Sequence, residues 1–513
     1  MTTLNWAARI GEIAVAAVLL GNSRGDGVRD IVLAAEEGGP AAPQVRARAR
    51  SESLTLVDTI DFSKWRPDTF AVSADGMRMA YASVEESGRG HMVIDGKAGK
   101  GYAGLAGKPV FSPDSRRVAY IAMNTQNQWV VAVDDGENPD KHPSVKGHAG
   151  VSPELCFSPD GRRLAYVVVA ESGGAVKQAV VVDHQEGAKY DAVDGLVFSP
   201  NGQRLAYAAK TGNQWAVVVD GREGRRHDSV FTGTPVFSPD GRHLAYGGRE
   251  GHRSFVVVDR KREHDYDDLG GMVRFSPDST KMVYSPNVGK RRAVVVNGDE
   301  LGLYERVDDS SFVFSANSKR LAYKAGDANS WFVVVDGKRG RTYAGVGRPV
   351  FTPDGRRVAH SACERCGGGA GNTAAMFVVV GGERIGAEYT DIDDRIEFSA
   401  DGSRMAFAAK RGTAQFVVVD KKEEKAYAGV MSESLEFSPS GRDFVYAAAN
   451  HAGSGFVVVS GVEGKEFDAV GLRGFEGSLL QGGRVLFEDD RSFRYLACMR
   501  ERVYLVRNTA RGR

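Results

Sequence analysis

Three residues in the second half of the chain have the types and spacing of metal ligands. His360 stands three residues before Cys363, Cys363 stands three before Cys366, and three glycines follow. Two thiolates with two residues between them can bind one zinc ion, and His360 is close enough in sequence to be a third ligand. A structural zinc site needs a fourth ligand, and no second Cys-x-x-Cys occurs. A redox-active thiol pair and an ordinary loop are the alternatives.

A second pattern suits acyl transfer at a serine. Gly21-Asn22-Ser23-Arg24-Gly25 matches the nucleophile elbow, which needs a large α/β sheet and later acid and histidine partners. Neither the short N-terminal segment nor the residues after Val470 have room for that sheet. Chance is therefore the better account of Ser23.

A third group consists of cations in two neighbouring loops. These are Arg249, His252, Arg253, Lys290, Arg291 and Arg292. The loops that carry them vary in length and charge between copies of a repeat. Residues 124–128, 135–148 and 171–177 vary in the same way. Variable loops on a rigid scaffold often carry recognition. A local basic patch that binds a partner is one interpretation, and a solvated loop surface is the other.

The elements that must position these residues come from a repeated phrase close to Phe-Ser-Pro-Asp-Gly-Arg-Arg-Leu-Ala-Tyr. It opens at Val72, Phe111, Phe157, Phe198, Phe237, Phe275, Phe314, Phe351, Phe398 and Phe437. The intervals of 37 to 47 residues suit a four-stranded propeller blade better than a helical hairpin. The sequence therefore predicts an array of one small β unit.

One copy shows how four strands are predicted. The strands are Val197–Phe198, Arg204–Tyr207, Trp215–Val219 and His227–Val230. Between the first two, proline fixes its own backbone angle and Gly202 accepts the positive φ of a tight turn. The third strand is apolar at every position, as expected for a strand covered on both faces. The fourth is more polar and suits an outer edge.

Two kinds of side chain recur within the phrase. An aromatic residue ends the second strand and is expected to pack between blades; His360 occupies this position in its own copy. The fourth position is usually acidic and the seventh usually basic, with His243 and Asp443 departing. Because both charges recur, we expect hairpin hydrogen bonds and ion pairs. A functional ring of charge on one face is the alternative.

The Ser-Pro-Asp-Gly hairpin followed by a basic residue and Leu-Ala-Tyr resembles the WD-like repeat of TolB-type β-propellers. The resemblance extends over most of the chain and implies an all-β propeller. It also implies a periplasmic location, since TolB-like proteins are typically exported. Propellers include binding scaffolds and enzymes, so the resemblance implies no particular activity.

The ten clear copies are followed by a degenerate eleventh unit over residues 478–506. A ring of ten or eleven blades exceeds the usual four to eight. This favours two tandem propellers, residues 51–270 and 271–507, with one large ring as the alternative. Residues Leu54 to Phe62 are expected to supply a strand that closes the ring onto the C-terminal blade.

Composition excludes several classes of partner. The 67 basic and 66 acidic residues give a net charge of +1, without a basic field for nucleic acid. No apolar stretch is long enough for a membrane span. Residues 1–50 are interpreted as a poorly ordered segment or a weak signal. The apolar run Ile13–Gly21 is short and lacks a preceding positive region, which points to a cytoplasmic location, whereas the resemblance implies a periplasmic one, so the compartment stays open.

These observations predict a non-enzymatic propeller that binds a protein partner through its variable loops and one face. No cofactor is expected beyond the candidate zinc, and the sequence carries no signal for an oligomeric state. The alternative is a propeller that binds or hydrolyses a small molecule, sugar or peptide in a central channel. Its lining would come from the innermost strands near Pro109, Leu196, Pro235 and Pro349.

Overall fold

The computed structural model describes most of the chain after residue 49. The described residues are 50–61, 63–134, 150–172, 175–231, 233–270, 273–366, 375–470 and 485–510, without the side chains of 150–153 and 170–172. The chain divides into Met1–Arg46 and Ala47–Arg513, and every described residue lies in the second unit. The predictions for residues 1–49, Ser23 among them, and for the 135–148 loop fall outside the described residues.

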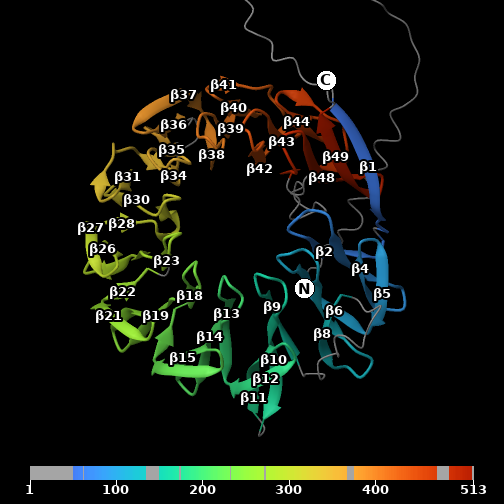
Figure 1. Ribbon diagram of the computed structural model, residues 1–513, viewed down its shortest axis with the longest axis vertical. Coiled ribbons are helices and arrows are strands. Elements are labelled where there is room, and N and C mark those ends of the chain that lie inside the picture. The colour runs from blue at the N-terminus through green and yellow to red at the C-terminus, as the bar shows by residue number, and fades with distance from the viewer. Residues whose placement is uncertain are drawn as a thin grey trace, which may run out of the picture. The chain divides into compact units, whose positions relative to one another are not determined.

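The repeat forms four-stranded antiparallel blades, as predicted (Figure 1). Blade one contains β2 (Trp65–Val72), β3 (Met79–Val84), β4 (Gly90–Ile94) and β5 (Lys97–Tyr102). Blade two contains β6 (Gly104–Phe111), β7 (Val118–Met123) and β8 (Trp129–Val133). Blade three contains β9 (Gly150–Phe157), β10 (Leu164–Ser172), β11 (Ala175–Val182) and β12 (Gln185–Tyr190). Blade four contains β13 (Ala192–Phe198), β14 (Leu205–Thr211), β15 (Gln214–Val219) and β16 (Arg222–His227).

From blade five to blade eight the innermost strand is divided into two short pieces. Blade five contains β17 (Ser229–Val230), β18 (Val236–Phe237), β19 (Leu244–Glu250), β20 (Arg253–Val258) and β21 (Lys261–Tyr266). Blade six contains β22 (Asp268–Leu269), β23 (Arg274–Phe275), β24 (Met282–Tyr284), β25 (Pro286–Val288), β26 (Arg291–Val296) and β27 (Asp299–Tyr304). Blade seven contains β28 (Arg306–Val307), β29 (Val313–Phe314), β30 (Leu321–Asp327), β31 (Ser330–Val335) and β32 (Lys338–Arg339). Blade eight contains β33 (Gly345–Val346), β34 (Val350–Phe351), β35 (Val358–Cys363), β36 (Met376–Val380) and β37 (Glu383–Tyr389).

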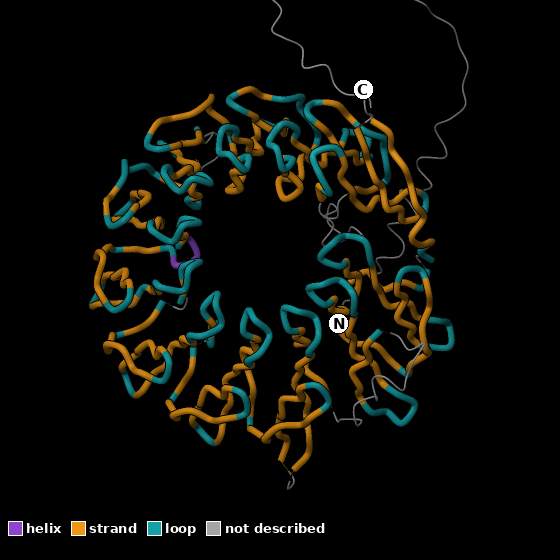
Figure 2. The backbone as a smooth tube through the Cα atoms, in the orientation of Figure 1, coloured by secondary structure: helices purple, strands orange, loops and turns teal. Residues whose placement is uncertain are grey.

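Three blades complete the array. Blade nine contains β38 (Asp391–Phe398), β39 (Met405–Arg411), β40 (Ala414–Val419) and β41 (Lys422–Glu423). Blade ten contains β42 (Gly429–Phe437), β43 (Phe444–Ala449), β44 (Gly455–Val459) and β45 (Val462–Glu463). Blade eleven contains β46 (Ala469–Val470), β47 (Leu486–Phe487), β48 (Ser492–Met499) and β49 (Arg502–Ala510), and β1 (Arg50–Thr59) is its outer strand. The described residues contain one helix, the 3₁₀ turn η1 (Asp309–Ser311), coloured purple in Figure 2.

The outer strand of blade four differs from the prediction. β16 occupies 222–227, directly after a turn at Asp220 and Gly221, and Ser229–Val230 opens blade five. Both turn residues have positive φ, 50° and 75°, which is the geometry of a two-residue hairpin that matches strand twist. Because of this tight turn, the fourth strand begins at residue 222, earlier than the predicted strand at 227–230.

The blades form one ring within the unit Ala47–Arg513 (Figure 1). Eleven clusters of buried apolar side chains lie at the junctions between consecutive blades, one for each junction. One of them joins Val256 of blade five to Met282 of blade six, across the boundary expected between two propellers. Another joins Leu496 of blade eleven to Phe70 of blade one. The single ring, the alternative interpretation, is therefore the observed arrangement.

The closing strand predicted near Leu54 is confirmed. β1 pairs antiparallel with β49 over its whole length, although it begins and ends earlier than predicted. Its Glu52 accepts a hydrogen bond from the Tyr495 hydroxyl of blade eleven at 2.8 Å. Its Asp58, which is buried, accepts one from the Tyr81 hydroxyl of blade one, also at 2.8 Å. The strand therefore completes the last blade and bonds to the first.

Within the described chain, no helix has the length and apolarity needed to cross a membrane.

Candidate functional site

The basic residue of the phrase ties most blades to the next. In six blades an arginine Nε lies 2.7–3.6 Å from the aspartate that ends the third strand of the same blade. Its Nη1 donates to carbonyls of the next blade's turn at 2.5–3.4 Å. Its guanidinium lies 5.2–5.6 Å from the centre of the next blade's phenylalanine ring. These arginines are Arg78, Arg117, Arg163, Arg204, Arg320 and Arg404. We call this arrangement the interblade lock.

The two departures from the phrase have structural explanations. In blade five, His243 Nδ1 lies 2.6 Å from Asp259 of its own blade. In blade ten, Asp443 takes the arginine position, and Arg50 of β1 places its Nη2 2.9 Å from the Asp443 carboxylate. The Arg50 guanidinium also lies 5.4 Å from the ring centre of Phe493 in blade eleven. The closing strand therefore supplies the guanidinium that blade ten lacks.

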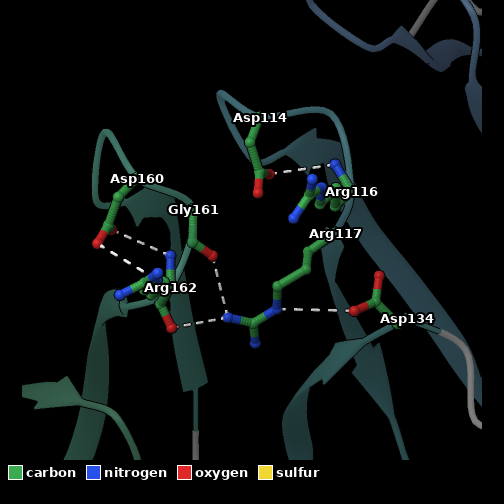
Figure 3. A pocket seen from close by; sticks show the side chains of 7 residues that line it. All are labelled: Asp114, Arg116, Arg117, Asp134, Asp160, Gly161 and Arg162. Atoms are coloured by element: carbon green, nitrogen blue, oxygen red, sulfur yellow. Dashed lines mark hydrogen bonds and ion pairs between the residues drawn. The ribbon is translucent and has the colours of Figure 1, made fainter.

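A pocket between blades two and three is lined by charged groups, some of which belong to the interblade lock (Figure 3). It is lined by Asp114, Arg116, Arg117, Asp134, Asp160, Gly161 and Arg162. Arg117 bonds to the carbonyls of Gly161 and Arg162 at 3.2 and 2.9 Å, and its Nε lies 3.6 Å from Asp134. A hydrogen bond from the Ser158 hydroxyl holds the pKa of Asp160 below its ordinary value. Three carboxylates face three guanidiniums, so the charges of this pocket balance one another.

The aromatic residues of the second strands pack between blades, as expected. In most blades this residue lies against a ring at the outer edge of the preceding blade, as Tyr323 does against Tyr304 with centroids 5.9 Å apart. The hydroxyls of these two tyrosines are 3.0 Å apart. In blade five the partner is His227, whose Nε2 lies 3.1 Å from the Tyr246 hydroxyl. Burial raises the pKa of Tyr246 to about 12, so the phenol stays neutral at ordinary pH.

The structure does not gather His360, Cys363 and Cys366 into one ligand set. The two sulfurs are joined in a disulfide. His360 lies beside Tyr343 with ring centroids 6.1 Å apart, and its Nδ1 is 2.9 Å from the Ser361 carbonyl oxygen. Among the residues described, no three His, Cys, Asp or Glu side chains are grouped to hold a metal. Zinc binding stays a prediction that would require the disulfide to be reduced.

The candidate basic patch is partly neutralised. Arg249 bonds to Asp268, Arg253 Nη1 lies 3.0 Å from Asp267, and Arg292 Nη2 lies 2.5 and 2.6 Å from the two oxygens of Asp309. The remaining three cations, His252, Lys290 and Arg291, are exposed. Within the described residues these three have no hydrogen-bond or ion-pair partner for their side chains. The sequence could not indicate which cations stay free, because the aspartates lie 14 to 19 residues further along the chain.

The two loops, 249–253 and 289–292, lie side by side; we call them the basic loops. Asp267 accepts from the Gly289 backbone N–H at 2.8 Å and from Arg253 Nη1 at 3.0 Å, so one carboxylate binds both loops. Asp228 accepts likewise from the Gly251 N–H at 2.7 Å. Each basic loop is therefore held by a carboxylate at the start of its own blade, and Asp267 of blade six also binds the loop of blade five.

The residues expected to line a channel offer little access to a ligand. Pro109, Pro235 and Pro349 are buried and Leu196 is half-buried. Each lies in or next to an innermost strand, as predicted. Their apolar and enclosed side chains provide no acid or base.

Comparison with known proteins finds no family and only distant structural likeness. No protein-family model matches the sequence, and no curated protein matches it. Similar solved structures include a eukaryotic initiation factor, with 12% identity, coverage of 76% of this chain and 96% of that one, and a TM-score of 0.39. An oligogalacturonate lyase in complex with manganese has 12% identity, coverage of 62% and 98%, and a TM-score of 0.28. A putative TolB from Agrobacterium tumefaciens has 17% identity, coverage of 40% and 84%, and a TM-score of 0.23. At these scores the likenesses carry no argument about activity.

Proposed function

We infer that this protein is a non-enzymatic scaffold whose basic loops bind an acidic segment of a protein partner. The observation that carries the proposal is the set of exposed basic side chains without partners within the described residues, His252, Lys290 and Arg291, on two loops that Asp267 holds together. Free cations on neighbouring loops can approach carboxylates of a partner without first breaking an internal ion pair. Charge complementarity of this kind favours encounter and fixes orientation.

The state of the other charged groups supports a scaffold over an enzyme. The recurring arginines and aspartates bond to each other in the interblade lock. His227 is buried, with Nδ1 2.9 Å from Glu250 and Nε2 3.1 Å from the Tyr246 hydroxyl. The hydrogen bond from His227 contributes most to lowering the pKa of Glu250, so this carboxylate stays ionised. Such groups are fixed in internal contacts and not directed at a substrate.

A pull-down with the intact protein tests the proposal. The test variant is Lys290→Glu/Arg291→Glu. The control is Lys338→Glu/Lys422→Glu, which makes the same charge change at two exposed lysines beside third-to-fourth strand turns. In an antiparallel blade these turns lie at the opposite edge from the basic loops. We expect at least one protein to be retained by the wild type and the control and lost from the test variant, with retention that falls as salt rises. Retention of no protein, or equal retention by both variants, would overturn the proposal.

A further inference from the structure

Blade eight breaks the interblade lock by losing its carboxylate. Six other blades place an aspartate at the end of the third strand, opposite the lock arginine. In blade eight this position is Gly381, whose N–H bonds to the Val358 carbonyl just as the Asp336 N–H bonds to Leu321 in blade seven. The arginine is still present, as Arg357. Its side chain forms no hydrogen bond, ion pair or cation–π contact within the described residues, and it is exposed where the six lock arginines are half-buried.

A cavity of about 300 Å³ lies between blades seven and eight, with Gly381 among its lining residues. Four arginines line it: Arg320, Arg341, Arg356 and Arg357. Its apolar wall consists of Val333, Val335, Val358, Val379 and Tyr343. No aspartate or glutamate is among the lining residues. Small-molecule sites typically have volumes of about 300–1,000 Å³, so the cavity can hold a small ligand.

Its charge sets this cavity apart from the pocket in Figure 3, which lies between blades two and three. There, Asp134 ends the third strand and lies 3.6 Å from Arg117, and three carboxylates balance three guanidiniums. In the blade-eight cavity Arg320 remains bound to Asp336 at 2.8 Å, and Arg341 lies 3.1 Å from Glu364 at the surface. Arg356 lies 4.0 Å from Asp354, and Arg357 forms no ion pair within the described residues.

A second substitution in blade eight changes the wall of the same cavity. His360 stands where blade seven has Tyr323, whose hydroxyl bonds to that of Tyr304. His360 forms no such bond to Tyr343. Its Nδ1 faces the Ser361 carbonyl oxygen at 2.9 Å, which makes Nδ1 the donor and leaves Nε2 an acceptor. The imidazole therefore adds a polar group to the cavity wall in place of a phenol bonded across the junction.

We propose that the blade-eight cavity binds a small organic anion, a phosphate monoester or carboxylate on an apolar body, with Arg357 as its principal anion ligand. A guanidinium presents parallel N–H donors that match carboxylate and phosphate oxygens in a bidentate pair. The valines and Tyr343 provide the surface for the apolar part. This site lies on other blades than the basic loops, so it is independent of partner binding.

Calorimetric titration of the full chain with phenyl phosphate, benzoate and inorganic phosphate tests the proposal. Arg357→Gln is the main variant. Gly381→Asp is the second, because it restores the lock carboxylate at a φ of 61°, close to the 47–51° of the six lock aspartates. Arg222→Gln, at an exposed position on the outer strand of blade four, is the charge-matched control.

We expect saturable binding of phenyl phosphate or benzoate that weakens about tenfold or more in Arg357→Gln and Gly381→Asp. Arg222→Gln should bind as the wild type does, and all variants should unfold cooperatively. Three results would overturn the proposal: saturable binding of inorganic phosphate alone, equal affinity in Arg357→Gln and Arg222→Gln, or unchanged affinity in a folded Gly381→Asp.

Discussion

The ring is closed by a strand from the other end of the chain, and Arg50 is the side chain on which this closure depends most. Its Nη2 lies 2.9 Å from Asp443, and the Arg50 and Asp443 side chains are 14% and 27% exposed. A hydrogen bond between charged groups contributes about 1.5–3 kcal/mol, and a cation over an aromatic ring about 0.5–1. We therefore expect Arg50→Ala to lower the free energy of opening β1 by about 2 kcal/mol or more.

Native-state hydrogen exchange measures this opening directly, since it reports the local opening of a strand separately from global unfolding. A loss of about 2 kcal/mol corresponds to roughly thirtyfold lower protection of the β1 and β49 amides. Asp443→Ala should have a similar effect, and the double variant should lose less than the sum. Arg66→Ala, which removes an exposed ion pair to Asp68, is the control and should leave β1 unchanged. Wild-type protection of β1 in Arg50→Ala, or strict additivity of the two substitutions, would refute the role of this pair.

Three further predictions concern the lock, the cysteines and the tyrosines. Arg404→Gln removes hydrogen bonds to Asp420 and to two carbonyls of blade ten, so it should lower the free energy of unfolding by about 2 kcal/mol. Arg357→Gln should change the free energy of unfolding by less than about 0.5 kcal/mol, and urea unfolding of both variants compares the two. Alkylation of the unfolded, unreduced protein should modify two of the four cysteines, because Cys363 and Cys366 form the disulfide. If elemental analysis instead finds one zinc per chain that is lost on Cys363→Ser, these cysteines bind the metal and the disulfide is wrong. Burial raises the pKa of Tyr246 in the folded protein from 10 to about 12. The contribution of Tyr246 to stability is therefore complete below pH 10 and is lost as the pH rises towards 12. A urea midpoint that stays constant from pH 10 to about 12 would contradict this.

The repeat made the fold readable from sequence, because each blade is a local unit with its own turn signals and apolar strand. The closing strand near Leu54 and the degenerate eleventh blade were predicted for the same reason. The ring size was not the favoured prediction. Consecutive blades contact only their neighbours, so the sequence does not indicate how many follow before the last meets the first. The contact between Leu496 and Phe70 decides this, and it spans most of the chain.

The charged positions were predicted less completely than the strands. The recurring charges were expected to serve the hairpins, and the Nε–aspartate contacts agree. The bonds from each arginine to the next turn could not be predicted, because they join residues about one repeat apart in separate blades, as with Arg404 and Arg442. The departure at Asp443 could not be predicted either, because its partner Arg50 comes from the other end of the chain. Blade eight carried a readable signal, an arginine kept while its aspartate became Gly381.

The repeat builds the ring, and we propose that Lys290 and Arg291 of the basic loops bind a partner. Hydrogen exchange of the intact protein, with and without the partner retained in the pull-down, locates the bound surface. The claim predicts slower exchange in 249–253 and 289–292 when the partner is present. Slower exchange confined to the phrase turns, such as 112–117, with the basic loops unchanged, would contradict it.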